Sequence, residues 1–166
     1  MNRQTTTMKS PVGTLTLIAD NKGLNAILWE KEKPHRVPLQ ATAEKKENPI
    51  FENAKKQLQE YFEGRRQKFN LPLSLAGTAF QKEVWQALAE IPFGEVRTYG
   101  EMAAKIGRPK AQRAVGAAIG RNPVSIVVPC HRVIGSDGSL TGFAAGLQTK
   151  SFLLRHENAP VKGLTE

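Results

Sequence analysis

The sequence predicts an α/β protein, in which a small N-terminal domain of sheet plus helix is followed by a mostly helical C-terminal domain. Two observations predict this class. Apolar and polar residues alternate in the first third of the chain, as in half-buried strands. The second half carries repeated helix-capping patterns, each ahead of apolar residues at helical spacing. With 166 residues, the chain is long enough for one compact domain or two small ones, and we place a boundary at Gly77, between domains 1–77 and 78–166.

The N-terminal domain begins with a predicted hairpin. Residues 14–19 alternate, residues 20–23 form an Asp-Asn-Lys-Gly turn cluster, and residues 24–29 are a second apolar run. The polar stretch 31–48 is expected to be a loop. Asn48 then serves as the N-cap of a helix with Pro49 in its first turn.

That helix is predicted to end at Gly64, after apolar residues that recur at helical spacing. Residues 69–75 are expected to be a short strand and a linker. The C-terminal domain opens with Thr78-x-x-Gln81, a capping box, and Thr98-x-x-Glu101 repeats the pattern ahead of a short helix that ends at Ile106.

A helix-turn-helix outline follows. The turn 107–109 contains glycine and separates the helix that starts at Thr98 from a second helix over 111–120. The second helix presents small side chains where a reader of the major groove needs long polar ones. Small side chains would let the helix backbone approach a widened minor groove, or they would simply pack against a neighbouring helix. The small residues are Ala114, Gly116, Ala117, Ala118 and Gly120.

Two further elements complete the expected domain. The apolar, β-branched run 125–128 is expected to be a short buried strand, and a final helix is expected from about Gln148 to His156. We expect His35 and His156 to lie on the surface.

Charge favours a polyanion as the partner. The chain has 24 Lys and Arg against 15 Asp and Glu, a net charge of +9. The alternative is a solvated surface on a basic protein. The density of basic residues is highest between residues 97 and 132, where Glu101 is the one acidic residue. The basic residues there are Arg97, Lys105, Arg108, Lys110, Arg113, Arg121 and Arg132.

Composition excludes several classes of protein. The chain is 40% hydrophobic and 23% charged, as in globular rather than disordered chains. No window approaches the length of apolar sequence that a membrane span requires, and the start lacks the apolar core of a secretory signal. A single cysteine excludes an intramolecular disulfide and a metal site of paired thiolates. We therefore expect a soluble, cytoplasmic protein.

Cys130 is the candidate nucleophile. It lies at the end of an apolar run, in Pro129-Cys130-His131-Arg132-Val133. Neighbouring cations and an imidazole base raise the thiolate fraction of a cysteine, and His131 and nearby arginines supply both. Because neighbours on a strand point to opposite faces, His131 is expected to act through a water or a turn. The alternative is a buried, inert cysteine.

The same five residues resemble the acceptor motif of the O6-alkylguanine-DNA alkyltransferases. The resemblance covers residues 78–157 in order and spacing, and the N-terminal third is similar in layout only. It is carried by Phe80-Gln81, Val84-Trp85, Ile91-Pro92-Phe93-Gly94-Glu95-Val96, Tyr99, Arg113-Ala114-Val115-Gly116, Asn122-Pro123, Gly135, Thr141-Gly142 and Leu153-Leu154-Arg155-His156-Glu157.

The resemblance implies a stoichiometric DNA repair reaction. The Cys130 thiolate would take the alkyl group from O6 of guanine, and also from O4-alkylthymine, in one irreversible displacement, after the damaged nucleotide is flipped out of the duplex. The implied partner is double-stranded DNA, held in the minor groove through backbone contacts. No cofactor is implied, and we expect a monomer.

Residue roles carry over by motif. Cys130 would be the alkyl acceptor, His131 the base that activates it through a water, and Glu157 the carboxylate that orients His131. Without the resemblance, Glu157 would be an ordinary surface carboxylate.

The resemblance also assigns the substrate-binding residues. Tyr99 would act near the rotated phosphate and the base nitrogen that is protonated as guanine leaves. Arg113 would fill the space of the flipped base, where the alternative is an ordinary phosphate contact. Asn122 would pin the turn before the acceptor, and the backbone at Val133 and Ala144 would hold the guanine edge.

The sequence departs from the family pattern in two places. Phe143 stands where many members have Tyr, so a hydroxyl is missing from the pocket loop, although the ring still supplies an apolar wall. Some members carry zinc in the N-terminal domain, but this chain lacks the necessary cysteines, so we expect no metal. Ser125 and the pair Ala144-Ala145 suggest a roomy pocket.

Three other functions compete with this interpretation. A lesion sensor would bind alkylated bases without transfer, although Cys130 argues against it. A helix-turn-helix regulator would prefer one DNA sequence rather than damage. A Cys-His hydrolase would turn over, whereas a suicide acceptor stops after one event.

Overall fold

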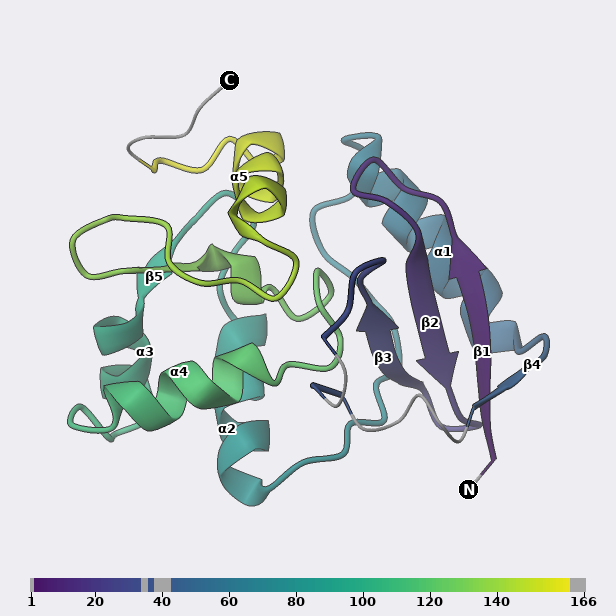
Figure 1. The fold of residues 1–166 in the computed structure, drawn as a ribbon, viewed down its shortest axis with the longest axis horizontal. Coiled ribbons are helices and arrows are strands. Elements are labelled where there is room, and N and C mark those ends of the chain that lie inside the picture. Colours follow the sequence, from purple (N-terminus) through teal and green to yellow (C-terminus); the bar gives the residue numbers. More distant parts are fainter. Residues whose placement is uncertain (1, 34–35, 38–42, 162–166) are drawn as a thin grey trace. The chain divides into compact units, whose positions relative to one another are not determined.

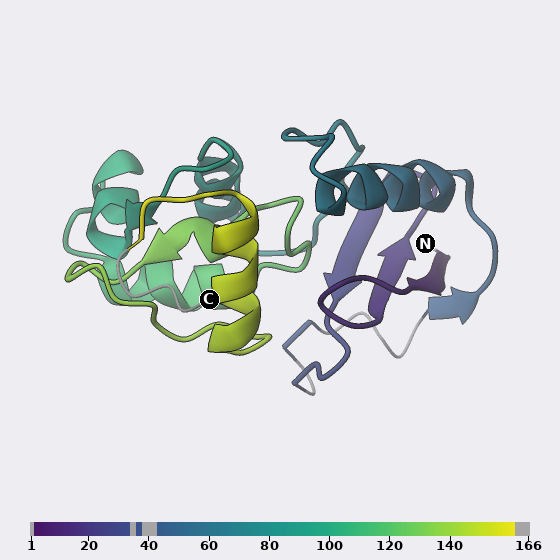
Figure 2. The same cartoon turned by 90° about the horizontal axis from the view of Figure 1, so that it is seen from above.

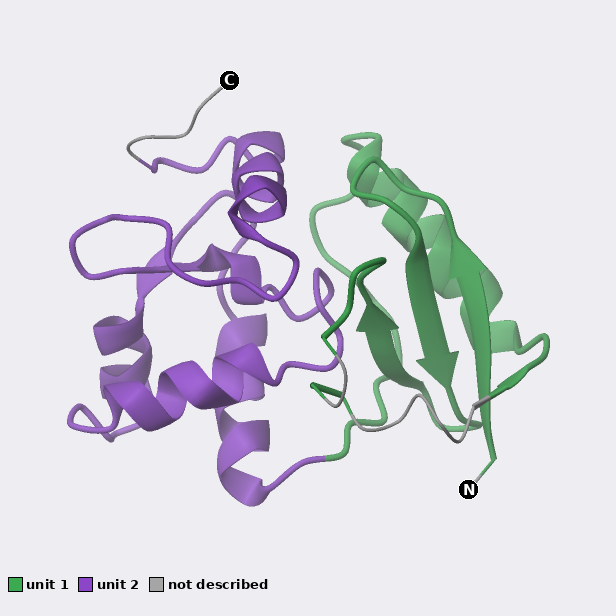
Figure 3. Cartoon of the chain, viewed as in Figure 1, with its two compact units in different colours: residues 1–76 green, residues 77–166 purple. Residues whose placement is uncertain are grey.

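The protein forms two compact units, Met1–Ala76 and Gly77–Glu166, in a computed structural model that describes residues 2–33, 36–37 and 43–161 (Figure 3). His35 lies outside the described residues. The fold confirms the predicted class, with sheet plus helix in the first unit and mostly helices in the second. No helix in the described part of the chain is long and apolar enough to cross a membrane.

The first unit is built on a four-stranded sheet of order β3-β2-β1-β4 (Figure 1). The predicted hairpin is confirmed as the antiparallel pair β2 (Leu15–Ala19) and β3 (Leu24–Leu28). Two further strands were not predicted from the sequence: β1 (Arg3–Met8), which pairs antiparallel with β2, and β4 (Ala43–Lys45), which pairs parallel with β1. The stretch expected as a loop therefore contains a strand, because a three-residue strand depends on its partner rather than on its own pattern.

Helix α1 (Pro49–Phe62) covers one face of this sheet (Figures 1 and 2). Its capping is as predicted: the Asn48 side chain accepts a hydrogen bond from the Ile50 N–H, at 2.9 Å, and Gly64 follows the helix with φ +78°. The strand expected within residues 69–75 is reduced to one isolated bridge between Leu73 and Leu24. The helix buries Phe51, Ala54, Gln57, Leu58 and Tyr61.

In the second unit, α2 (Ala79–Ala89), α3 (Tyr99–Lys105) and α4 (Gln112–Gly120) pack together. Both predicted capping boxes are present, at the starts of α2 and α3. The turn between α3 and α4 contains Gly107 at φ +76°, a left-handed conformation that favours glycine. Because α2 lies against α4, the Trp85 indole N–H reaches the Ala118 carbonyl at 2.8 Å.

The chain after α4 contains the short elements that hold the cysteine. These are the 3-10 turn η2 (Cys130–Arg132), strand β6 (Val133–Ile134) and helix α5 (Leu147–His156). Strand β6 pairs parallel with β5 (Arg97–Thr98), so the residue before α3 and the residues after Cys130 are neighbours.

Candidate active site

The predicted strand over residues 125–128 is instead a tight turn. Ser125 and Val128 form an isolated bridge, and Ile126 between them has φ +75°. The Asn122 side chain closes this turn, since its amide donates to the Val128 carbonyl at 2.8 Å and its oxygen accepts from the Val124 N–H at 3.1 Å. The side-chain bonds of Asn122 thus replace the strand pairing that the apolar pattern suggested.

Cys130 begins η2 and is 6% exposed. Its N–H donates to the Val128 carbonyl at 2.9 Å, so the turn that Asn122 closes continues directly into the cysteine. The expectation that Cys130 and His131 alternate along a strand is wrong, because the backbone turns at this point. The sequence also allowed His131 to act on Cys130 through a turn instead of a water, and a turn is present here.

His131 and Glu157 are brought together from 26 residues apart in the sequence. The His131 Nε2 and Glu157 Oε2 atoms are 2.7 Å apart, and neither side chain is exposed. Glu157 is therefore not a surface carboxylate. It caps the C-terminus of α5, where the end of the helix meets η2.

Arg132 is the second partner of Glu157, a role that was not predicted from the sequence. Its Nε donates to Glu157 Oε1 at 2.7 Å, and a terminal nitrogen donates to Oε2 at 3.0 Å. Its other terminal nitrogen donates to the Ile91 carbonyl at 2.6 Å. Arg132 is 5% exposed, so it belongs to the buried cluster and not to the basic surface in which its charge was counted.

These contacts determine the protonation of the buried pair. Burial raises the pKa of the Glu157 carboxyl, but the hydrogen bonds and charges of His131 and Arg132 outweigh it and hold that pKa well below its usual range. Burial lowers the pKa of the His131 imidazole, although Glu157 opposes the shift. An ionised Glu157 accepts the Nε2–H of a neutral His131, which leaves the Nδ1 lone pair available as a base.

The Nδ1 atom is well placed for that role. It is buried, and it has no hydrogen-bond partner in the described part of the chain. A buried polar atom without a partner is unusual and calls for a functional reason.

Lys150 is a site residue that the sequence analysis missed. It is 1% exposed on α5, and its Nζ donates to the carbonyls of Val133, at 2.6 Å, and Thr141, at 3.2 Å. Burial lowers the pKa of its ammonium to about 8, while the charge of a Cys130 thiolate acts in the opposite direction. The available signal was a lysine at a core-facing position, three and four residues before the buried Leu153 and Leu154.

The loop before α5 closes against the same cluster. Thr141 Oγ1 lies 3.2 Å from the hydroxyl of Tyr99, the first residue of α3. The Phe143 ring lies with its centre 5.9 Å from Lys150 Nζ, so the residue that lacks the usual hydroxyl makes a cation–π contact. Tyr99, Val133 and Phe143 are therefore linked through Thr141 and Lys150.

Helix α4 divides its small residues between two faces. Ala118 is buried together with Val115 and Ile119, as the packing alternative requires. Arg113, Ala114 and Ala117 are exposed. After Gln112 and Arg113 in its first turn, the exposed side of α4 thus presents only small residues, which leaves its backbone open to approach.

Arg113 and Ala144 are not joined to the Cys130 cluster by any bond within the described residues. Arg113 is exposed near the start of α4, and Ala144 is half-buried in the loop before α5. Within the same described ranges, no group of three or more His, Cys, Asp or Glu side chains is arranged to hold a metal ion.

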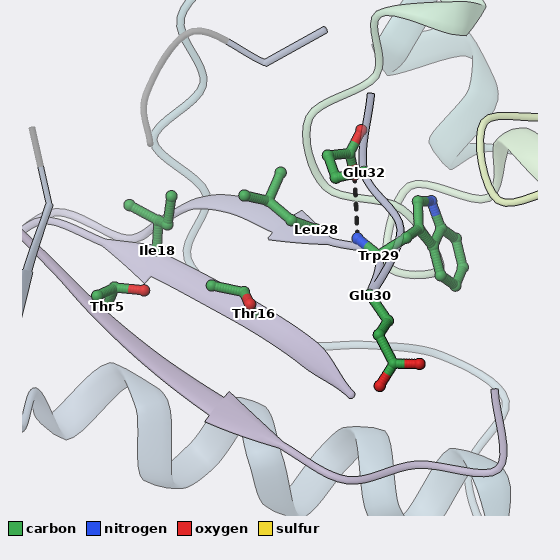
Figure 4. Close-up of a pocket in the computed structure, with 7 residues that line it drawn as sticks. All are labelled: Thr5, Thr16, Ile18, Leu28, Trp29, Glu30 and Glu32. Atoms are coloured by element: carbon green, nitrogen blue, oxygen red, sulfur yellow. Dashed lines mark hydrogen bonds between the residues drawn. The ribbon is translucent and has the colours of Figure 1, made fainter. Parts of the chain in front are cut away.

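A separate cavity of about 340 Å³ lies in the first unit (Figure 4). Thr5, Thr16 and Ile18 point into it from the sheet face away from α1. Trp29 lies at its end, and the Trp29 backbone N–H donates to the Glu32 carboxylate at 3.0 Å. None of the predicted site residues lines this cavity.

The second unit thus defines a class of protein in which a helix-turn-helix is followed by a buried cysteine beside a histidine–glutamate–arginine cluster. The family model of the 6-O-methylguanine DNA methyltransferase DNA-binding domain matches residues 79–159, and that of the ribonuclease-like domain of the same methyltransferases matches residues 4–75. The chain belongs to the 6-O-methylguanine DNA methyltransferase family.

Several proteins with known names are similar in sequence to most of this chain. A methylated-DNA–protein-cysteine methyltransferase of Methanosarcina barkeri is 50% identical over 151 residues, which cover 90% of this chain and 94% of the relative. The constitutive enzyme of that name from Bacillus subtilis is 46% identical over 160 residues, covering 95% and 96%. The Mycobacterium tuberculosis protein solved in complex with DNA is 42% identical, with TM-score 0.85 and 96% of each chain covered.

Proposed function

We propose that this protein repairs alkylated DNA by transferring the alkyl group from O6 of guanine, and also from O4 of thymine, to the Cys130 sulfur. One observation carries the proposal: His131, the residue after Cys130, has an unpaired Nδ1, and a buried bond from its Nε2 to Glu157 holds its imidazole. Membership of the family and the names of the relatives support the same reaction.

In this reaction the thiol proton passes through a water to His131 Nδ1, and Glu157 stabilises the imidazolium that forms. The Cys130 thiolate then attacks the alkyl carbon in line. The new carbon–sulfur bond forms as the carbon–O6 bond breaks, and its electron pair moves into the guanine ring. The Tyr99 hydroxyl gives its proton to the ring nitrogen of the leaving guanine and regains one from solvent.

Lys150 contributes a buried cation whose charge acts on Cys130. Its ammonium favours the thiolate over the thiol at Cys130, and this charge–charge attraction is strong because the site is largely closed to water. Asn122 holds the preceding turn, and the backbone at Val133 and Ala144 would contact the guanine edge. The Val133 carbonyl already accepts a bond from Lys150.

Double-stranded DNA is the proposed partner. The exposed side of α4 would enter the minor groove, where its small side chains let the backbone approach, and Arg113 would fill the space of the flipped nucleotide. The complex of the Mycobacterium tuberculosis relative with DNA supports this partner. Because most contacts would go to phosphates, affinity should fall steeply with salt.

Of the two domains, the one formed by residues 78–166 would bind DNA and accept the alkyl group. The match of the DNA-binding family model to residues 79–159 supports this division. A monomeric, cytoplasmic protein without a metal or cofactor remains our expectation.

The decisive experiment is the intact mass of the protein after incubation with duplex DNA that contains O6-methylguanine. We expect a gain of one CH₂ that maps to Cys130 and saturates at one per molecule. Cys130→Ala should bind the damaged duplex and gain no mass. If the protein gains no mass but still binds the damaged duplex, it is a lesion sensor. Repeated turnover would indicate a hydrolase, and a preference for one undamaged DNA sequence would indicate a regulator.

A further inference from the structure

The hydroxyl of Thr141 reaches the hydroxyl of Tyr99 across 42 residues of sequence, at 3.2 Å. Thr141 lies in the loop between β6 and α5, and Tyr99 is the first residue of α3. Both side chains are half-buried. No local turn explains this contact, because the two residues come from elements that the fold brings together.

Both ends of the contact are held in place. The Thr141 carbonyl accepts a bond from Lys150 Nζ at 3.2 Å, and the same ammonium donates to Val133 at 2.6 Å. On the other side, Thr98 caps the turn of helix in which Tyr99 lies. A Cβ added to Gly116 of α4 would lie 3.7 Å from the Tyr99 ring, so α4 packs closely beside that ring.

We propose that Thr141 is a positioning residue for alkyl transfer, whose hydroxyl donates to the Tyr99 phenol oxygen and so directs the phenol proton to the substrate. This proposal rests on the proposed role of Tyr99. When the ring nitrogen of the leaving guanine takes the Tyr99 proton, the phenol oxygen can only accept, and Thr141 is the donor in reach.

The contribution grows as the reaction proceeds. Transfer of the Tyr99 proton leaves negative charge on the phenol oxygen, and a hydrogen bond to a charged acceptor is stronger than one to a neutral acceptor. The Thr141 bond is therefore tighter in the transition state than in the resting protein, and an interaction of this kind raises the rate of the chemical step.

The first test compares Thr141→Val with Thr141→Ser in single-turnover transfer from an O6-methylguanine duplex. Valine keeps the shape and the backbone bond to Lys150 but removes the hydroxyl, and should slow transfer about three- to tenfold. Serine keeps the hydroxyl and should retain the wild-type rate. Ser139→Ala is the matched control, because it removes a hydroxyl of the same loop that donates to Asp137 instead.

The second test combines Thr141→Val with Tyr99→Phe. Without the phenol, loss of the Thr141 hydroxyl should slow transfer no further. A substrate in which the ring nitrogen that accepts the Tyr99 proton is replaced by C–H should likewise react equally with wild type and Thr141→Val. Equal slowing by Thr141→Val in both backgrounds, or a wild-type rate for Thr141→Val alone, would overturn the proposal.

The two proposals fail in different ways. If wild type gains no mass on Cys130, the proposed function is wrong. If mass is gained but Tyr99→Phe reacts at the wild-type rate, Tyr99 is not the proton donor, and the Thr141 proposal is wrong while alkyl transfer stands. Thermal unfolding of each variant shows that a slow rate comes from chemistry rather than from loss of fold.

Discussion

His131 Nε2 and Glu157 Oε2 lie 2.7 Å apart in a buried pair, and the same carboxylate accepts two bonds from Arg132. This arrangement gives Glu157 two tasks. It fixes the histidine tautomer that leaves Nδ1 available as a base, and it neutralises a guanidinium that could not otherwise be buried. The end of α5 therefore determines the chemistry at η2.

Replacing that carboxylate should impair both tasks. We expect Glu157→Gln to slow alkyl transfer by at least about tenfold and to lower the free energy of unfolding by about 3–5 kcal/mol, because Arg132 is left buried without a counter-charge. Single-turnover rates and urea unfolding measure the two effects. Glu95→Gln is the control. Glu95 forms a solvent-exposed ion pair with Arg97, so this variant should change neither the transfer rate nor the free energy of unfolding.

The same variant should alter the response to acid. The pKa of Glu157 is lower in the folded protein than in the unfolded chain, so its contribution is present above the unfolded value, about 4.3, and is lost as the pH falls toward the folded value. Wild type should therefore lose more stability than Glu157→Gln on going from neutral pH to about pH 3. Parallel stability curves for the two proteins would contradict the buried ion pair.

Lys150 should control the ionisation of Cys130. Its ammonium is charged below pH about 8 and loses its charge above that value, so the stabilisation of the thiolate declines on the alkaline side. We expect Lys150→Met to raise the pKa of the Cys130 thiol by at least about one unit and to slow transfer about tenfold at neutral pH. The pH dependence of alkylation by iodoacetamide measures that pKa. Lys105→Met, at a half-exposed lysine, should leave it unchanged.

What the sequence predicted depended on the range of the interactions. The capping boxes at Thr78 and Thr98 are set by residues three apart, so pattern alone located two helix starts. The bond between Arg132 and Glu157 joins residues 25 apart, and no local pattern shows it.

The turn over residues 125–128 shows a different limit of sequence-based prediction. Its apolar, β-branched residues favour a strand, but the side chain of Asn122 supplies the hydrogen bonds that a partner strand would have given. The position of His131 next to Cys130 identified it as a candidate base from the sequence alone, whereas Glu157 was identified only through the resemblance, because their contact exists only after α5 packs on η2.

The exposed side of α4 should require small residues to approach DNA. We expect Ala117→Gln to weaken duplex binding about tenfold, for damaged and undamaged DNA alike, because its longer side chain holds the backbone away from the groove. Stability should change by less than about 0.5 kcal/mol, since Ala117 is exposed. Ala89→Gln makes the same change at an exposed position of α2 and should bind normally. Equal binding by both variants would mean that α4 does not enter the groove.

Ile126 should be strained in its turn, since a β-branched residue at φ +75° costs about 1–3 kcal/mol. Ile126→Ala removes buried contacts and keeps most of that strain, whereas Ile126→Gly removes the same contacts and relieves it. We therefore expect the glycine variant to be more stable than the alanine variant by about 1 kcal/mol in urea unfolding. At Ile119, which is buried within α4, the order should reverse, because glycine destabilises a helix by about 1 kcal/mol relative to alanine. If the alanine variant is more stable than the glycine variant at both positions, the turn before Cys130 is not strained.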